Sequence, residues 1–561
     1  MEKTNILKRV LAATMLLLVA IPSWCADGDT FTANTVEGVS MTFKVISESE
    51  KTCQVGISMD NSEYSYSTSK VAINNTSYSG TLTVPSAVNG YSVVAIGSSA
   101  FYYCNITKVS IPETITNIGR YAFYNCDKLN SAIYNSHIFA KLPKSYSGSY
   151  TIPVRTIEQI APDAFYYCSN LTSVTIPSSV TTIGDYAFAE CSKLTSINIP
   201  EGVTTIGSYA FAYCSSLTSI NIPEGVTSIG QWAFESCRNL SSVSIPESVT
   251  SIGMSAFYEC TSLPTINGIR YADTYAHIAV DKTQSSYQIR EGTRFIGANC
   301  FYNCKYLNSI VIPESVISIG ENAFSECTNL SSITIPESCL RMGDNGMNLF
   351  YNCSKLPVIN GIRYAGPFVV EIVDKTQTQY ALEEGTRFIG YNAFQGCENM
   401  VYARLPKSIT MIGQDAFKSC PKLSDIYLEA EEVPYAHYLA IPGKTNINLH
   451  VPSISIGKYM ASTFWSTFAS FLAYEGEINI ELIDGNVYDN PAAYLTDNIT
   501  YSRTFKNTNW QAWYVPFEVE LTSDLLSRFS FAKYAGTYVD ENSDPSFFIT
   551  IARLKAGDKL K

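Results

Sequence analysis

Cysteines recur in this sequence at a fixed interval of 23 residues. One uninterrupted series consists of Cys168, Cys191, Cys214, Cys237 and Cys260. Between these cysteines, leucine, isoleucine, valine and phenylalanine return at the same offsets in every unit. Self-similarity at a fixed period of this length is typical of repeat architectures, in which each unit contacts only its neighbours. The interval therefore predicts a solenoid, and a solenoid escapes the size limit of a single globular core.

The unit that follows each cysteine suggests how one coil folds. Residues 197–199 alternate apolar and polar side chains, as a half-buried strand requires, and Pro200 ends that strand because it cannot donate a ladder hydrogen bond. Residues 203–206 predict a second short strand. Gly207 is expected to allow a turn with positive φ, and residues 210–211 are expected on a helical turn with phenylalanine as the core plug. The predicted fold class is a solenoid of short strands plus short helical turns in each 23-residue coil.

The cysteine interval is interrupted at three places. Gaps of 42 or 44 residues follow Cys126, Cys260 and Cys353, and the second and third inserts begin with the same run at Ile266 and Ile359. Each insert restarts the repeat, which indicates an extra coil bearing a hairpin. The solenoid is therefore expected to have about 12 to 15 coils.

The repeated cysteines are interpreted as a structural ladder of buried thiols. Cys300 replaces the alanine of the Ala-Phe pair and Cys339 replaces a core valine, so the sequence uses cysteine as a small apolar residue. Disulfides between adjacent coils are possible, because equivalent positions lie within bridging distance and an exported protein meets oxidising conditions. They are the less favoured alternative to buried thiols. A metal site is less favoured again, since the chain has no Cys-x-x-Cys pair.

The chain is predicted to begin with an export signal. Lys3, Lys8 and Arg9 precede an apolar run over residues 10–21, which is too short to span a membrane comfortably, and no later segment is expected to be transmembrane. The protein is therefore expected to be secreted or held at the cell surface. The predicted organisation is a signal peptide at 1–25, an N-terminal β-rich cap at 26–79, a solenoid with three hairpin inserts at 80–428, a capping segment at 429–475 and a β-rich domain, interpreted as truncated, at 476–561.

Charge and composition exclude some classes of partner. The net charge is −12 with 16% charged residues, whereas phosphate binding requires clustered lysine and arginine, so nucleic acid is not an expected partner. The 38 tyrosines and the many serine, threonine and asparagine residues indicate a polar, weakly charged surface suited to broad contact.

Two sets of side chains are candidates for ligand contact. The exposed positions of the first strand form polar columns: Thr195, Ser196, Asn198, Thr218, Ser219, Asn221, Ser241, Ser242 and Ser244. These columns are either a contact surface for a protein or glycan or simply a solvated strand face. Tyr271 and Tyr275, in a hairpin insert, are either specific contacts or part of a flap over the core.

No motif for catalysis, cofactor binding or metal binding is found. The four histidines lie outside any nucleophile or metal-ligand motif, and no phosphate-binding glycine loop is present. No catalytic residue, cofactor or metal ligand is predicted, and the protein is not expected to be an enzyme.

The full repeat pattern, Cys-x-x-Leu-x-x-Ile-x-Ile-Pro-x-x-Val-x-x-Ile-Gly-x-x-Ala-Phe, resembles the BspA-type leucine-rich repeat over residues 80–428. The resemblance implies a leucine-rich repeat solenoid in a surface protein of a host-associated microbe. It further implies adhesion, meaning binding to host matrix or cell-surface macromolecules. Two alternatives stay open: a structural or glycan-binding component of the cell surface, and an enzyme whose site lies in the C-terminal β-rich domain.

Overall fold

The computed structural model describes residues 26–58, 71–73, 77–153, 156–343 and 348–474, and six short strands beyond residue 474. The chain divides into two compact units, one comprising residues 1–359 and 363–366 and the other residues 360–362 and 367–561. Each unit is described by itself. The predicted signal peptide lies outside the described residues, as does most of the predicted C-terminal β-rich domain.

The first unit opens with a small group of β-strands. Strands β1 (Thr30–Asn34), β2 (Ser40–Ser47) and β3 (Thr52–Val55) form an antiparallel meander. Strand β3 then pairs in parallel with β6 (Tyr91–Ile96), which forms a hairpin with β5 (Ala87–Val88). This group of strands is therefore joined to the solenoid by the same parallel pairing that joins one coil to the next.

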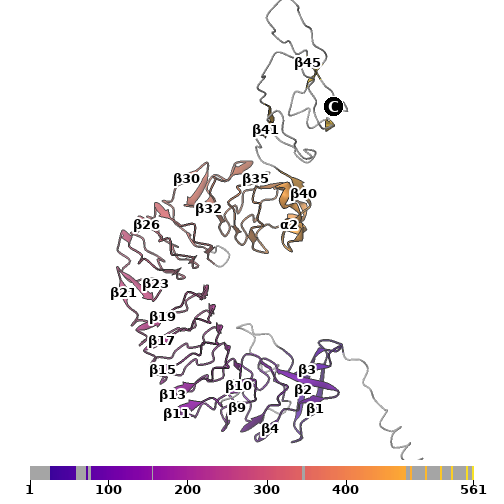
Figure 1. The fold of residues 1–561 in the computed structure, drawn as a ribbon, viewed down its shortest axis with the longest axis vertical. Helices are drawn as coiled ribbons and strands as arrows, with labels where there is room; N and C mark the ends of the chain where they lie inside the picture. Colours follow the sequence, from indigo (N-terminus) through magenta and orange to yellow (C-terminus); the bar gives the residue numbers. More distant parts are fainter. Residues whose placement is uncertain are drawn as a thin grey trace, which may run out of the picture. The chain divides into compact units, whose positions relative to one another are not determined.

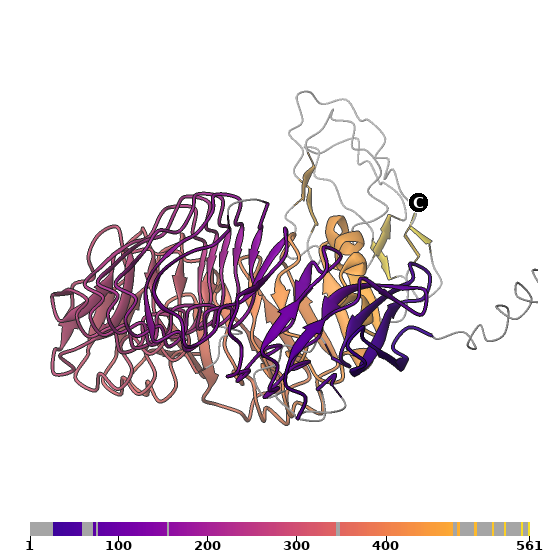
Figure 2. The same cartoon turned by 90° about the horizontal axis from the view of Figure 1, so that it is seen from below.

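Two parallel ladders run through the coils that follow (Figures 1 and 2). The first ladder uses the strand that precedes the proline in a regular unit; its members are β4 (Thr81–Thr83), β7 (Lys108–Ser110), β11 (Ser147–Thr151), β13 (Asn170–Thr175), β15 (Ser196–Ile197), β17 (Ser219–Asn221), β19 (Ser242–Ser244), β24 (Ser286–Tyr287), β26 (Ser309–Val311) and β28 (Ser332–Thr334). The second ladder uses the strand that precedes the repeated Gly in a regular unit; its members are β8 (Asn117–Ile118), β10 (Ile138–Lys141), β12 (Gln159–Ile160), β14 (Thr182–Ile183), β16 (Thr205–Ile206), β18 (Ser228–Ile229), β20 (Ser251–Ile252), β23 (Tyr275–Ala279), β25 (Phe295–Ile296), β27 (Ser318–Ile319) and β29 (Arg341–Met342). Strands β10, β12, β23 and β24 are the members that lack the following glycine or proline. The register places Ile183, Ile206 and Ile229 side by side, so the ladder follows the 23-residue repeat.

Hairpins interrupt the regular coils where the cysteine interval is missed. Strand β9 (Ile133–Tyr134) pairs antiparallel with β10, and β22 (Ile269–Ala272) pairs antiparallel with both β21 (Thr265–Ile266) and β23. Strands β30 (Val358–Ile359) and β31 (Ile362–Ala365) belong to the third insert. The antiparallel pairs of the first two inserts therefore lie at two of the places where the cysteine interval is missed.

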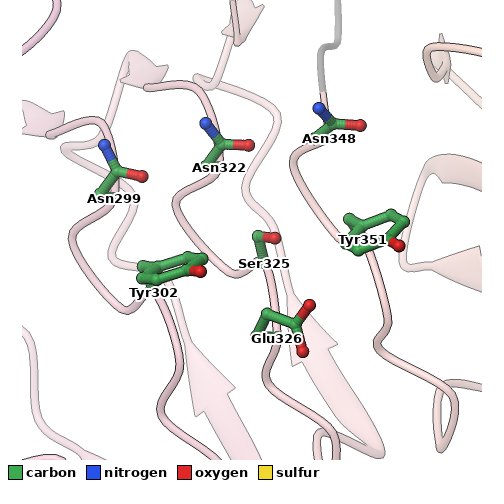
Figure 3. A pocket seen from close by; sticks show the side chains of 7 residues that line it. All are labelled: Asn299, Tyr302, Asn322, Ser325, Glu326, Asn348 and Tyr351. Carbon is green, nitrogen blue, oxygen red and sulfur yellow. The ribbon is translucent and has the colours of Figure 1, made fainter.

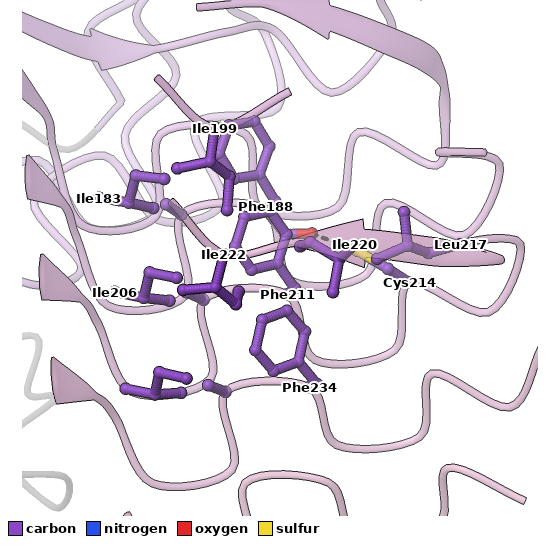
Figure 4. Close-up of a cluster of buried hydrophobic side chains, with 14 of the residues drawn as sticks. Ile183, Phe188, Ile199, Ile206, Phe211, Cys214, Leu217, Ile220, Ile222 and Phe234 are labelled. Atoms are coloured by element: carbon purple, nitrogen blue, oxygen red, sulfur yellow. Dashed lines mark hydrogen bonds between the residues drawn. The ribbon is translucent and has the colours of Figure 1, made fainter. Parts of the chain in front are cut away.

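The core is a column of stacked phenylalanine rings. Phe188, Phe211 and Phe234 are fully buried, and their ring centroids lie 5.2 and 5.3 Å apart with nearly parallel planes (Figure 4). The isoleucines of both ladders close around these rings. One coil buries its own phenylalanine only with a coil on either side, which explains why a single unit cannot fold alone.

The repeated cysteines are free thiols, and most are fully buried. In most of these cysteines Sγ also has a polar role, which the sequence did not indicate. Cys214 donates a hydrogen bond of 3.2 Å to the Phe188 carbonyl oxygen of the preceding coil, and Cys237 donates an equivalent bond to Phe211. Over most of its length, the cysteine column therefore joins each coil to its predecessor as well as filling space.

Two local expectations about the turn are wrong. Gly207 does not adopt a positive φ; instead, a Cβ at this position would lie 2.6 Å from the backbone N of Asp185, so glycine is required by the close approach of adjacent coils. The segment around Phe211 is a series of turns rather than a helical turn. The positive φ values belong to Tyr209 and Tyr213, two large side chains that flank this phenylalanine.

The second unit continues the same two-ladder arrangement. One ladder contains β32 (Phe368–Ile372), β34 (Phe388–Ile389), β36 (Met411–Ile412) and β38 (Tyr435–Ala436); the other contains β33 (Gln379–Ala381), β35 (Tyr402–Leu405), β37 (Asp425–Leu428), β39 (Asn448–Val451) and β40 (Ser470–Ala473). Over the residues that the structure describes, the solenoid has about 17 turns. This exceeds the expected number because segments 26–79 and 429–475 add parallel strands of their own.

A short helical segment covers the last coils. It comprises η2 (Lys444–Asn446), η3 (Ser453–Ser455), α2 (Ile456–Ala461) and η4 (Trp465–Thr467). Tyr459 and Trp465 are buried, and they donate hydrogen bonds to the carbonyl oxygens of Ala430 and Pro434, at 2.8 and 3.0 Å. This is the amphipathic cap that a terminal coil requires, because its apolar face has no further coil to cover it.

Beyond residue 474, the described strands are β41 (Ile480–Leu482), β42 (Ile499–Tyr501), β43 (Val519–Glu520), β44 (Ala532–Tyr534), β45 (Ile551–Arg553) and β46 (Lys559–Leu560). In the described part of the chain, no helix is both long and apolar enough to cross a membrane.

Candidate interaction surfaces

The polar columns predicted from the sequence lie on the exposed side of the first ladder. Every residue named in those columns, from Thr195 to Ser244, is exposed. The register places Ser219 beside Ser242 and Asn221 beside Ser244. Some hydroxyls already serve the fold, since Thr195 and Ser241 each donate to a backbone carbonyl of the preceding coil. The columns are therefore accessible, but part of their hydrogen-bonding capacity is used between coils.

Tyr271 and Tyr275 do not lie on the surface, so the interpretation of these two residues as ligand contacts is wrong. Tyr271 is fully buried, and its hydroxyl accepts a hydrogen bond of 3.1 Å from the backbone N–H of Arg290. Tyr275 is also buried, with its ring 5.4 Å from that of Phe257. The hairpin turns its aromatic side chains inward, because they replace the core side chains of a regular coil.

The structure reveals a second surface, formed by the turn that follows the second ladder in each coil. In the regular coils, two positions of this turn have a positive φ, and nearly all of them are occupied by residues other than glycine. The first position, two residues after the repeated Gly, is occupied by Ser99, Tyr121, Asp163, Tyr186, Tyr209, Trp232, Ser255, Asn299, Asn322, Asn348, Asn392 and Asp415. The second, four residues later, is occupied by Tyr103, Asn125, Tyr167, Glu190, Tyr213, Ser236, Glu259, Asn303, Glu326, Asn352 and Ser419.

This left-handed backbone has a structural reason. It directs alternate N–H groups of the turn along the solenoid axis toward the next coil. Tyr186, Phe188 and Glu190 donate in this way to the carbonyl oxygens of the following coil, at 2.8, 2.7 and 2.8 Å. The turn is thus a third ladder of hydrogen bonds, and every coil must adopt the same conformation whatever side chain it carries.

Asparagine and aspartate tolerate this conformation, whereas large aromatic residues do not. Tyr121, Tyr186, Tyr209 and Trp232 nevertheless occupy the first position, the last three of them in consecutive coils, with φ between 55° and 61°. Each is expected to be strained by about 1–2 kcal/mol relative to a right-handed residue. Backbone strain that persists in a folded protein is often found at functional sites, so it suggests a function for these aromatic side chains.

These aromatic residues are part of a continuous surface that we call the aromatic strip. Its members are Tyr102, Tyr103, Tyr121, Tyr124, Tyr166, Tyr167, Tyr186, Tyr209, Tyr213, Trp232 and Tyr258, and none of them is buried. The rings of Tyr186 and Tyr209 stack at 4.6 Å, and those of Tyr209 and Trp232 at 6.1 Å. Similar contacts connect Tyr102 to Tyr124 at 5.3 Å. Stacked rings cover one another's faces, so the strip presents mainly ring edges and hydroxyl groups to solvent.

Charged side chains support one end of the strip. Arg120 forms an ion pair of 2.6 Å with Asp185, and its guanidinium lies over the Tyr186 ring, 5.3 Å from the centroid. Lys144 lies near the rings of Tyr124 and Tyr167. Burial raises the pKa of Tyr186 far above its ordinary value, so this phenol stays protonated at any physiological pH.

Two carboxylates lie beside the middle of the strip. Burial, with smaller contributions from neighbouring carboxylates, raises the pKa of Glu190 and of Glu235. Tyr213 donates a hydrogen bond of 3.1 Å to Glu235. Among the described residues, neither carboxylate has a basic partner within ion-pair distance, whereas Glu259 is paired with Arg238. The strip is therefore slightly acidic as well as aromatic.

The strip could have been found in the sequence by comparing the units position by position. Tyr121, Tyr186, Tyr209 and Trp232 each lie five residues before the repeated cysteine and so fall in one column. The abundance of tyrosine was recognised, but its position within the repeat was not. No group of three metal-binding side chains is arranged around a common point among the described residues.

The repeat and its geometry identify the class of protein. Residues 71–157, 158–278, 280–363 and 374–484 match the family described as the BspA type leucine rich repeat region, with six copies. The chain belongs to this family. No curated protein matches the chain.

Several solved structures are similar. A leucine-rich repeat protein from Bacteroides ovatus is 23% identical, with 71% of this chain and 94% of that chain covered and a TM-score of 0.28. A leucine rich cell surface protein from Faecalibacterium prausnitzii is 27% identical, with coverage of 72% and 95% and a TM-score of 0.28. The pneumococcal vaccine antigen PcpA is 15% identical, with coverage of 81% and 100% and a TM-score of 0.27.

Proposed function

We propose that this protein is an exported surface protein that binds other proteins, and mediates adhesion, through the aromatic strip. Its family supplies a rigid repeat scaffold suited to interactions. The basic residues and apolar run at its start favour export. The chain acts in this proposal by binding rather than by catalysis.

The observation that carries the proposal is the placement of large aromatic residues at left-handed positions. Tyr186, Tyr209 and Trp232 occupy a backbone conformation that suits asparagine, the residue found in the corresponding positions of later coils, such as Asn299 and Asn322. Stability of the single coil favours the asparagine. A binding role explains why the strip retains aromatic side chains instead.

The chemistry of the strip favours a protein partner. Tyrosine and tryptophan provide a large contact area with little loss of side-chain entropy, and they are enriched in protein interfaces and binding hot spots. The stacked arrangement exposes hydroxyl groups and ring edges, which can hydrogen-bond and pack at the same time. A row of such groups suits a broad contact with many small contributions.

The test is binding of the purified chain to a panel of immobilised extracellular matrix proteins and to whole host cells. The strip variant replaces Tyr186, Tyr209 and Trp232 by asparagine, the residue that the fold itself uses at this position. The matched control replaces Ser196, Ser219 and Ser242 by alanine on the exposed face of the first ladder. We expect the strip variant to lose at least about tenfold in affinity, equivalent to about 1.4 kcal/mol, and the control to bind normally. Loss of binding in the control alone would assign the interaction to the polar columns, and binding to no member of the panel would favour a structural role.

A further inference from the structure

A polar hollow of about 380 Å³ lies in the first unit, on the turns of three consecutive coils beyond the aromatic strip (Figure 3). Its lining consists of Asn299, Tyr302, Asn322, Ser325, Glu326, Asn348 and Tyr351. The hollow is open to solvent.

A small side chain lies at the centre of the hollow. Tyr302, Ser325 and Tyr351 occupy the same position of the repeat, one residue after the core phenylalanine. At one end of the aromatic strip that position is filled by Tyr102, Tyr124 and Tyr166, whose rings are in contact. Ser325 leaves the equivalent space empty between two tyrosines, as Figure 3 shows.

Three asparagine side chains form one wall of the hollow. Asn299, Asn322 and Asn348 lie in a row, one from each coil, and all are half-buried (Figure 3). Their left-handed φ angles of 59°, 53° and 48° explain why the fold accepts asparagine at these positions. The backbone does not use the amide groups themselves: the structure shows no hydrogen bond between these three side chains and any described residue. Each amide has two N–H donors and one carbonyl acceptor available to a ligand.

The opposite side of the hollow is also polar and is held in place. Glu326 accepts a hydrogen bond of 2.8 Å from the side-chain amide of Asn352, which fixes its carboxylate. Tyr302 and Tyr351 are exposed and stand at the two ends. Of the seven residues that line the hollow, Glu326 is the only charged one.

These groups select a class of ligand. The absence of a basic side chain from the lining disfavours anions, and the polar lining disfavours hydrophobic molecules. The amide and carboxylate groups can form hydrogen bonds with ligand groups that both donate and accept, and adjacent hydroxyl groups of a sugar have this property. The two tyrosine rings offer apolar surface to the C–H groups of a sugar ring.

We propose that this hollow binds a neutral hexose unit of a surface glycan. It is a second site, separate from the aromatic strip and independent of the function proposed for the strip. The open geometry predicts weak binding of a single sugar, with a Kd on the order of 1 mM.

The test is titration of the full chain with the methyl glycosides of glucose, galactose and mannose, followed by ligand-observed NMR. Asn322→Gly removes the central amide without backbone strain, because glycine adopts a φ of 53° freely. Ser325→Tyr fills the hollow with the side chain that Tyr124 places at the same repeat position. Asn303→Gly is the matched control, since Asn303 has a similar φ of 62° in one of the same coils but does not line the hollow.

We expect at least one glycoside to bind, with binding weakened at least about tenfold by Asn322→Gly, abolished by Ser325→Tyr and unchanged by Asn303→Gly. Binding of none of the three glycosides at about 10 mM would overturn the proposal. So would binding that both hollow variants retain, or binding confined to sulfated or sialylated sugars. Circular dichroism of each variant separates loss of the site from loss of the fold.

Discussion

The strained aromatic column predicts an unusual stability result for Tyr209→Asn. The substitution removes two ring contacts, at 4.6 Å to Tyr186 and at 6.1 Å to Trp232, each worth about 0.5–1.5 kcal/mol. It also releases about 1–2 kcal/mol of left-handed strain, because asparagine tolerates a φ of 55°. The two effects oppose one another. The lost apolar burial of the half-buried ring adds to the cost, so we expect the free energy of unfolding to fall, but by less than the about 3–5 kcal/mol that loss of a fully buried ring costs.

The comparison is Phe211→Ala, two residues away in the same coil. Phe211 is fully buried between Phe188 and Phe234 and its φ is not positive, so no strain is released when its ring is removed. We expect this variant to lose about 3–5 kcal/mol. Guanidinium unfolding followed by circular dichroism measures both variants under the same conditions. If Tyr209→Asn lowered the free energy of unfolding as much as Phe211→Ala, the aromatic side chains of the strip would be explained by their contribution to stability. The inference of a binding role from backbone strain would then be wrong.

Three further predictions concern other features of the first unit. Burial raises the pKa of the Cys168 thiol to about 11, so a thiol reagent at pH 8 should leave this cysteine unmodified in the native protein. The same reagent should modify Cys168 after denaturation without reductant, and disulfide-paired peptides in mass spectrometry would contradict the ladder of free thiols. Gly207→Ala should be strongly destabilising, since its Cβ would lie 2.6 Å from a neighbouring backbone nitrogen, and a melting temperature equal to that of wild type would disprove the close-packing role. The pKa of Glu190 and of Glu235 is raised above the ordinary value of 4.5, so ionisation of these two carboxylates opposes folding. The free energy of unfolding should therefore rise as the pH falls through the region just above 4.5. Replacing both residues by glutamine should flatten that part of the pH–stability curve.

The strands and the core could be predicted from the sequence because their signals are local and repeated. Alternation around Ile197 and the proline at 200 mark one strand, and the recurring phenylalanine marks the core column. A 23-residue period then requires equivalent residues to lie side by side, as the register of Ile183 and Ile206 shows. These features depend on burial and on chain geometry, which the sequence records directly.

The turn could not be predicted in the same way. Glycine is the usual indicator of a positive φ, yet here Gly207 serves close packing, and Tyr209 and Tyr213 adopt the left-handed conformation. Their conformation is set by hydrogen bonds to the next coil, which a single unit of sequence does not contain. The hollow at Ser325 is a second example, because it arises from a small residue between two coils that carry tyrosine. A site that is formed by side chains from several neighbouring coils becomes visible only when the coils are stacked in the folded structure.

The hairpin residues show the opposite error. Tyr271 and Tyr275 are candidates for ligand contact in the sequence because inserts often carry specific contacts, and the alternative is a flap over the core. Both are buried, since the insert provides a coil of its own and needs aromatic side chains to fill it. An irregular segment in a repeat can therefore serve to fill the core, and it is not always a binding site.

The central claim is that the aromatic strip is the surface that meets the partner. Hydroxyl-radical footprinting of the full chain, alone and bound to whichever panel protein it recognises, tests this claim directly. The account predicts protection of Tyr167, Tyr213 and Tyr258, which are exposed in the free protein, with the polar columns around Ser219 unchanged. Protection of the polar columns while these three tyrosines stay fully reactive would contradict it.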